Sequence, residues 1–231
     1  ASVTIDVMAK EALATIGRAA QQGGVSNAGG LVLAEWQMPA LVIVIGYCLG
    51  SIPFGLLLTR LGGAGDLRAI GSGNIGATNV LRTGRKGLAA ATLLLDGLKG
   101  ALAVWLGAQL LADGGPVLGG GPALIGHCYP LWLRFHGGKG VATMLGISLA
   151  LAWPVGVAFG IVWLGATMLS RISSVSGMSA AISAPLAAWL LGLSALLPGF
   201  AAMAVLVLWR HRPNIARLLR GEEPRIGVSR S

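Results

Sequence analysis

"LVIVIGYCLGSIPFGLLL", residues 41–58, decides the class of fold, because eighteen consecutive residues carry no charged side chain. A second run, residues 88–111, contains only Asp96 and Lys99 as charged residues. A helix needs about 20 mostly apolar residues to cross the hydrocarbon core of a bilayer. The whole chain is 55% hydrophobic and only 11% charged, whereas soluble domains carry about 25% charged residues. The sequence therefore predicts an integral membrane protein.

The apolar segments follow one another from Trp36 to Trp209. Their expected helical ranges are 36–59, 88–112, 123–133, 141–152, 155–169, 176–192 and 195–209. Several are shorter than the ~20 residues of a full span, so we expect some half-length helices or helices that extend into polar ends. The predicted fold is an all-α integral membrane protein with about seven transmembrane helices, some short, and with glycine-rich cytoplasmic loops.

Residues 1–34 differ from the rest of the chain and are interpreted as an N-terminal extension. Residues 3–20 could form a short amphipathic helix, and "QQGGVSNAGG", residues 21–30, is typical of a flexible link. The region makes a weak signal peptide, because no basic start is followed by an apolar core. We expect this extension to lie outside the cytoplasm, and residues 35–231 to form one membrane domain.

The net charge of +9 is distributed unevenly along the chain. The first, third, fifth and last connectors carry the cations, whereas the connectors near 113–122, 153–154 and 193–198 carry none. Cytoplasmic loops of membrane proteins have this excess of Lys and Arg. We therefore expect the amino terminus outside, the carboxyl terminus inside, and no binding of nucleic acid, since the cations lie in short connectors between apolar segments.

The first polar connector contains "GSGNIGATNVLR", residues 71–82. Its glycines match G-x-G-x-x-G, but a dinucleotide site also needs a preceding strand, which the sequence does not offer. Closely spaced glycines before a helix still let backbone amides approach a phosphate. Short polar side chains and the cation of Arg82 add donors, so we interpret this loop as an anion cradle. The alternative is a plain turn between two helices.

The segment "FHGGKGVAT", residues 135–143, repeats this design with Lys139 among glycines before an apolar helix. It is not a Walker loop, because glycine follows Gly138-Lys139 where Ser or Thr is required. We interpret it as part of a second anion cradle. The alternative is a glycine loop whose lysine only sets the membrane topology.

Other polar residues give weaker signals. A single histidine such as His127 in an apolar helix is more often a packed core residue than a catalyst. Asp96 and Lys99 are three residues apart on one helical face, which predicts an ion pair. No Asp follows any histidine at the His-x4-Asp spacing of a common acyltransferase class, and no His/Cys metal cluster is present in the sequence. The chain therefore offers donors and cations but few bases.

Four blocks together are similar to those of the PlsY family, the bacterial acyl-phosphate:glycerol-3-phosphate acyltransferases. They are "GSGNIGATNVLR", "GHCYPLWLRFHGGKGVAT", "SRISS" and "RHRPNIARLLRG", in this order. The resemblance covers residues 36–228. The family's first block usually has proline where this chain has Ile75, a change that removes no hydrogen-bonding side chain.

The resemblance implies a seven-helix enzyme of the bacterial inner membrane with its site at the cytoplasmic face. It implies transfer of a fatty acyl group from acyl phosphate to the 1-hydroxyl of glycerol 3-phosphate, the first acylation of phospholipid synthesis. Acyl phosphate, glycerol 3-phosphate and the lipid bilayer are the expected partners. No cofactor and no metal are expected, and a monomer is the working expectation. The residues expected to act in catalysis are Ser72, Asn74, Arg82, His127 and Lys139. The residues expected to bind substrate are Gly71, Gly73, Gly76, Ala77, Thr78, Asn79, Gly137, Gly138, Gly140, Arg171, Ser173, His211 and Asn214.

Two other classes of function share some of these sequence features. A membrane transporter of organic phosphate anions would also place glycine-rich half-helices against anions, but it is expected to contain internal repeats that this sequence lacks. A phosphotransferase acting on lipid nucleotides would need clustered aspartates for metal ions. The transporter is kept as the alternative.

Overall fold

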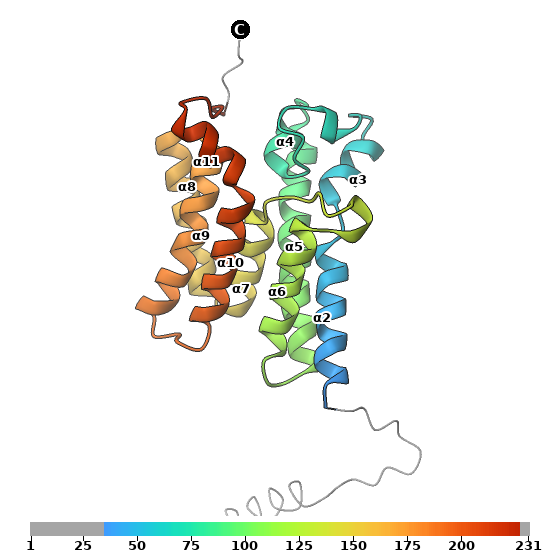
Figure 1. Cartoon of the computed structure of the whole chain (residues 1–231), viewed down its shortest axis with the longest axis vertical. Helices are drawn as coiled ribbons and strands as arrows, with labels where there is room; N and C mark the ends of the chain where they lie inside the picture. Colours follow the sequence, from blue (N-terminus) through green and yellow to red (C-terminus); the bar gives the residue numbers. More distant parts are fainter. Residues whose placement is uncertain (1–34, 227–231) are drawn as a thin grey trace, which may run out of the picture. The chain divides into compact units, whose positions relative to one another are not determined.

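The computed structural model describes residues 35–226, and every regular element in that range is a helix (Figure 1). The predicted extension, residues 1–34, lies outside the described residues. The described residues belong to one compact unit, which begins at Glu35. The apolar helices are α2 (Gln37–Gly50), α3 (Phe54–Leu61), α5 (Lys86–Leu110), α6 (Gly115–Cys128), α7 (Val141–Leu151), α8 (Trp153–Ser170), α9 (Ser173–Leu190) and α10 (Leu197–Arg210). The connectors and the tail add η1 (Leu67–Ala69), α4 (Ala77–Leu81), η2 (Leu131–Leu133) and α11 (Arg212–Leu219).

The prediction of an all-α membrane protein with some short helices is confirmed. Three segments of the described chain are long and apolar enough to cross a bilayer: Gln37–Leu61, Lys86–Leu110 and Trp153–Ser170. Helices α7 and α10 are apolar but shorter. Large apolar side chains such as Leu94, Ile161 and Val205 are exposed on the outside of the bundle, as expected where lipid replaces water.

The first predicted helix is interrupted between α2 and α3, at Ser51–Pro53. Pro53 has no amide hydrogen and restricts the residue before it, so the helix ends there. The interruption frees backbone carbonyls, and two side chains from elsewhere take them up. Lys99 Nζ donates to the carbonyl of Ile52 at 2.8 Å, and Trp132 Nε1 donates to that of Ser51 at 2.9 Å. The break is therefore a structured joint within the membrane segment.

Helix α6 begins about two turns earlier than predicted, because its glycines read as a connector. Pro116 lies in its first turn, where the fixed φ of proline suits a helix. A side chain at Gly119 would overlap the backbone carbonyl of Ala103 on α5, and one at Gly46 would overlap Gly119 itself. Small residues allow membrane helices to approach this closely. Helices α2, α5 and α6 therefore pack together through their backbones.

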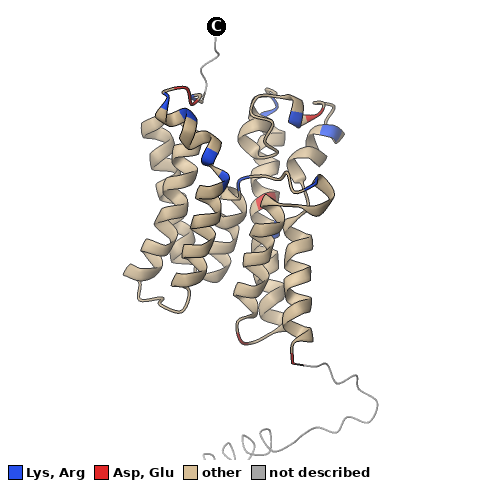
Figure 2. Cartoon of the chain, viewed as in Figure 1, with Lys and Arg blue, Asp and Glu red and all other residues tan. Residues whose placement is uncertain are grey.

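Helix α7 links this group to the group formed by α8, α9 and α10, since it contacts both α5 and α8 (Figure 1). The larger core cluster lies among these helices and includes Leu124, Met144, Phe159 and Phe200, each fully buried. Figure 2 shows that Lys and Arg gather toward the end of the bundle that carries α3, α4 and α11, as the alternating connectors predict. The opposite helix ends carry no cation within the described residues.

Candidate active site

A cavity of about 570 Å³ opens among the loops at the basic end of the bundle. Its wall combines the first glycine loop with α4, the start of α7, the start of α9, the α10–α11 junction and the chain after α11. His127 and Asp96 also line it, from α6 and α5. Residues far apart in the sequence therefore meet around one space.

Asn79 organises the first glycine loop. Its Oδ1 accepts from the backbone amide of Ser72 at 3.2 Å and from Arg82 Nη1 at 3.1 Å. Its Nδ2 donates to the carbonyls of Leu67 and Ile70 at 3.0 and 2.9 Å. Both ends of this buried amide are therefore engaged with the protein. Asn79 shapes the loop and holds Arg82 at the cavity.

Several backbone amides of the first loop have no acceptor among the described residues. Gly71 and Gly73 adopt positive φ angles of 55° and 67°, which fold the chain back before α4. Within the described residues, the amides from 74 to 78 donate to no protein acceptor. Ser72, Asn74 and Thr78 line the same wall. A run of open amides beside a cation is the arrangement that binds an oxyanion.

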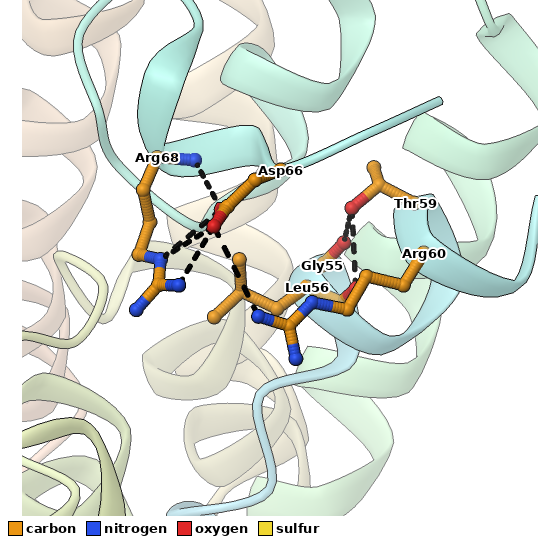
Figure 3. Close-up of polar contacts among 6 residues, drawn as sticks. All are labelled: Gly55, Leu56, Thr59, Arg60, Asp66 and Arg68. Atoms are coloured by element: carbon orange, nitrogen blue, oxygen red, sulfur yellow. Dashed lines mark hydrogen bonds and ion pairs between the residues drawn. The ribbon is translucent and has the colours of Figure 1, made fainter. Parts of the chain in front are cut away.

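A turn directly before η1 stabilises the segment that leads into this loop. Asp66 accepts hydrogen bonds from the backbone and the guanidinium of Arg68 and lies 3.9 Å from Arg60 Nη2 (Figure 3). The hydrogen bonds from Arg68 hold the pKa of the Asp66 carboxyl well below its usual range. This turn leads into Leu67, whose carbonyl is one of the acceptors for Asn79. Asp66 therefore fixes the end of the loop that Asn79 binds.

The second glycine loop is built differently. The amides of Gly137 and Gly138 donate to the carbonyls of Cys128 and His127 at 3.2 and 2.9 Å. Their own carbonyls accept from Arg210 Nη2 and Nε at 2.9 and 3.0 Å. These two glycines do not line the cavity, because the loop uses them to join the ends of α6 and α10.

Only the last part of the second loop reaches the cavity, through Lys139, Gly140 and the first turn of α7. The amides from 139 to 142 have no acceptor among residues 35–226. Burial is the main cause that lowers the pKa of Lys139 to about 8, and the cations Arg217, Arg82 and Arg210 lower it further, against the attraction of Glu223. Lys139 thus brings a poorly solvated cation to the cavity.

Residues of the tail close the remaining side. His211 Nδ1 lies 2.7 Å from the carbonyl of Val207, so it is the protonated nitrogen, and Nε2 is left as an acceptor in the neutral ring. Asn214 Nδ2 donates to Glu223 Oε1 at 2.5 Å. The tail continues across the start of α9, where the Ile226 amide donates to the carbonyl of Arg171 at 2.7 Å.

Asp96 joins two side chains at the deep end of the cavity. Its Oδ1 lies 2.7 Å from Lys99 Nζ, which confirms the predicted ion pair, and 3.7 Å from His127 Nδ1. All three side chains are at most 4% exposed. A His–Asp pair therefore exists here, although no Asp follows a histidine at the His-x4-Asp spacing.

A model of the glycerol-3-phosphate acyltransferase family matches residues 40–221. The chain belongs to this family. The glycerol-3-phosphate acyltransferase of Erythrobacter litoralis is 55% identical over 191 residues, which cover 82% of this chain and 95% of that relative. The corresponding protein of Caulobacter vibrioides is 58% identical over 193 residues, or 81% and 87% of the two chains.

Two crystal structures of PlsY (YgiH), an integral membrane glycerol 3-phosphate acyltransferase, have the same fold. The glycerol 3-phosphate form is 37% identical with a TM-score of 0.77, covering 82% of this chain and 96% of that chain. The lysophosphatidic acid form is 35% identical with a TM-score of 0.76, covering 82% and 95%. The resemblance to the PlsY family is confirmed.

Most residues that the sequence analysis placed in the site of this acyltransferase-family chain do surround the cavity. Those that line it are Gly71, Ser72, Asn74, Gly76, Ala77, Thr78, Asn79, Arg82, His127, Lys139, Gly140, Ser173, His211 and Asn214. Gly73, Gly137, Gly138 and Arg171 do not line it. The three glycines shape or anchor the two loops, whereas Arg171 is exposed at the α8–α9 connector.

Sequence reasoning missed several residues that line the cavity. Ser174, Arg217 and Glu223 form a connected polar group in its wall, and Trp163 adds an aromatic side chain. The only sequence signal for Glu223 is the adjacent pair of acids Glu222 and Glu223 in an otherwise basic tail. Within the described residues, no group of three or more His, Cys, Asp or Glu side chains could hold a metal ion.

Proposed function

We propose that this member of the acyltransferase family transfers a fatty acyl group from acyl phosphate to the 1-hydroxyl of glycerol 3-phosphate. The products are lysophosphatidic acid and inorganic phosphate, and the reaction is the first acylation of phospholipid synthesis. Family membership and the similarity to PlsY in its glycerol 3-phosphate and lysophosphatidic acid forms support the acceptor and the product. The choice of acyl phosphate as donor rests on the charge of the cavity.

The observation that carries the proposal is a pair of unpaired cations, one from each glycine loop. Arg82 and Lys139 both line the cavity, and neither forms an ion pair with any residue from 35 to 226. The acids in the wall are already matched with cations: Asp96 with Lys99, Glu222 with Arg220 and Glu223 with Arg217. The cavity therefore has excess positive charge and two sets of open amides, which suits two substrates that each carry a phosphate.

The reaction needs little covalent help from the protein. The 1-hydroxyl oxygen attacks the carbonyl carbon of acyl phosphate, a new ester bond forms, and the bond from that carbon to the phosphate oxygen breaks. The hydroxyl proton passes to the departing phosphate. Arg82, Lys139 and the open amides hold the two substrates in line and stabilise charge on the leaving group. His127, which lies beside Asp96, is the alternative proton acceptor.

An apolar part of the cavity wall gives the acyl chain a route to lipid. Leu93 of α5, Val141 and Ala142 of α7 and Trp163 of α8 line it. The first carbons of the chain would pack on these side chains while the phosphate stays among the cations. The chain then passes between the helices into the bilayer, and the product leaves by the same path.

The distribution of charge supports an orientation for the protein. The cavity lies at the end of the bundle where Lys and Arg gather (Figure 2), and cations of short loops favour the cytoplasmic side. We place the cavity and the carboxyl terminus in the cytoplasm and the start of α2 on the outer side of the bacterial inner membrane. A monomer is proposed as the active unit.

Phosphate release by the purified protein tests this function. Palmitoyl phosphate with glycerol 3-phosphate should give lysophosphatidic acid and phosphate in equal amounts, and omitting the acceptor should abolish release. Equal phosphate release without glycerol 3-phosphate would show hydrolysis instead of transfer. Activity is expected to survive EDTA; loss that added metal ions restore would contradict a metal-free reaction. Uptake of glycerol 3-phosphate into protein-containing liposomes without product would support the transporter alternative.

A further inference from the structure

Glu223 lies at the centre of a hydrogen-bond group in the cavity wall that the proposed reaction leaves unexplained. Its Oε1 accepts from Ser174 Oγ at 2.7 Å and from Asn214 Nδ2 at 2.5 Å. Its Oε2 accepts from Arg217 Nε at 2.7 Å. The three donors come from the start of α9 and from α11, and the Glu223 side chain is only 5% exposed. One carboxylate thus joins two helices to the chain that follows α11.

A carboxylate that contacted the substrates directly would be unfavourable in this place. Both proposed substrates are anions, and an unpaired carboxylate beside them would repel them. Burial alone would raise the pKa of Glu223, but the hydrogen bonds from Asn214, Ser174 and Arg217 outweigh it and lower the pKa below the usual value. The carboxylate is therefore ionised and its charge is taken up by protein donors. Such an acid is suited to orienting its neighbours.

The neighbour whose orientation matters most is Asn214. An ionised carboxylate can only accept hydrogen bonds, so the amide must turn its Nδ2 toward Glu223. Its Oδ1 then points the other way, where it is buried and has no hydrogen-bond partner among the described residues. Asn214 is 4% exposed and lines the cavity. A buried, unsatisfied carbonyl oxygen at a cavity wall is a place for a ligand that donates a hydrogen bond.

We propose that Glu223 is a positioning residue: its carboxylate holds the amide of Asn214 so that Oδ1 accepts a hydrogen bond from a hydroxyl of glycerol 3-phosphate. This inference rests on the proposed function, because a glycerol hydroxyl is the only neutral donor group on either proposed substrate. Arg217 and Ser174 anchor the carboxylate itself. Glu223 acts through Asn214 and touches neither substrate.

The Glu223→Gln variant tests this role. A glutamine amide can present its own NH₂ to residue 214, which lets the Asn214 amide turn over and offer a donor in place of the acceptor. KM for glycerol 3-phosphate should rise about tenfold, the value of one lost hydrogen bond at its upper range, while KM for palmitoyl phosphate stays within about twofold. Asp113→Asn, which removes an exposed acid from the α5–α6 turn, is the control for net charge and should leave both KM values unchanged.

A double variant separates positioning from a general structural effect. If Glu223 acts through Asn214, KM for glycerol 3-phosphate in the Asn214→Ala/Glu223→Gln double variant should exceed that of Asn214→Ala by less than about twofold. Full additivity of the two changes would overturn the inference, and so would an equal rise in both KM values. Should Glu223→Gln unfold, Ser174→Ala, which removes one anchor of the carboxylate, should still raise KM for glycerol 3-phosphate selectively; an unchanged KM would contradict the proposal.

Binding of glycerol 3-phosphate without acyl phosphate tests the role of Glu223 independently of the acyl-transfer reaction. Glycerol 3-phosphate without acyl phosphate should raise the unfolding temperature of the wild-type protein, and Glu223→Gln should reduce that shift. A reduced shift supports the positioning role even if no acyl transfer occurs. A wild-type shift that Glu223→Gln leaves intact would overturn the role of Glu223 while leaving the reaction untouched.

Discussion

The two glycine loops have similar sequences but different structures. In the first loop the amides from 74 to 78 have no acceptor within residues 35–226, and the Asn79 side chain forms the hydrogen bonds inside the loop. In the second loop Gly137 and Gly138 bind α6 through their amides and Arg210 through their carbonyls, and open amides begin only at Lys139. The second loop therefore presents its cation from a backbone that is already fixed on both sides.

This difference shows that glycines before a helix indicate how the chain can bend, not which amides are free. The decisive partners are residues distant in sequence, such as the carbonyls at the end of α6. A loop whose amides are taken up can still belong to a site when it carries a cation at its end.

Replacing one glycine of each loop by alanine should show the difference between the two loops most clearly. A Cβ at Gly138 would overlap the imidazole of His127, whereas one at Gly76 would meet only Asn74 Nδ2, at 3.5 Å. Gly138→Ala should lower the free energy of unfolding by about 3 kcal/mol, the upper range for overpacking, and reduce activity far more than tenfold. Gly76→Ala should keep the wild-type unfolding temperature in detergent. Equal stability of both variants would contradict the packed role of the second loop.

Removing either free cation should affect activity without affecting the fold. Arg82→Ala and Lys139→Ala should each lower kcat/KM at least tenfold, which corresponds to about 1.4 kcal/mol of transition-state stabilisation. Phosphate-release kinetics measure this effect. Arg85→Ala is the matched control, because Arg85 is exposed next to the first loop and does not line the cavity. A near-normal rate in either of the first two variants would remove that residue from the site.

Removing the hydrogen bonds that Arg210 donates to the carbonyls of the second loop should mainly lower the stability of the protein. Arg210→Gln removes two charge-assisted hydrogen bonds to Gly137 and Gly138, and we expect a loss of about 1.5–3 kcal/mol in the free energy of unfolding. Arg212→Gln, at an exposed arginine that donates to the carbonyl of Trp209 and stacks on its ring, should change it by less than about 1 kcal/mol. Denaturant titration in detergent measures both, and similar losses would contradict a special role for Arg210.

The smallest expected effect is a shift in pH dependence. The pKa of Lys139 is lowered to about 8, so the protonated form that binds anions is lost as the pH rises through that value. Above pH 7, where a substrate phosphate with its second pKa near 6 is fully ionised, kcat/KM for glycerol 3-phosphate should fall as pH passes about 8. Lys139→Arg keeps its charge at these pH values, and its profile should stay flat. A wild-type profile that is flat to pH 10 would contradict the lowered pKa.

The class of fold could be predicted from the sequence, and so could the location of both glycine loops at the cation-rich end of the bundle. Uninterrupted apolar runs and alternating cation-rich connectors are local signals that depend on no tertiary contact. The break at Pro53 was harder to predict, since membrane helices tolerate proline when other groups satisfy the freed carbonyls. Here those groups are Lys99 and Trp132, which lie on other segments.

The site was predicted less completely than the fold, for the same physical reason. Gly137 and Gly138 looked available for an anion because their acceptors on α6 could not be known. The pairing of Asp96 with His127 joins two helices, so no spacing within one helix reveals it. Glu223 was not among the predicted site residues, because its role depends on three donors brought from α9 and α11.

The hydrogen bond between the Ile226 amide and the Arg171 carbonyl has a practical consequence for handling the protein. It ties the polypeptide beyond the last helix to the connector between α8 and α9, three residues after Glu223. Shortening the gene so that translation stops at Gly221 would delete this tether together with the carboxylate that orients Asn214. Affinity tags and fusion partners are therefore better appended downstream of residue 226, where they leave that attachment intact.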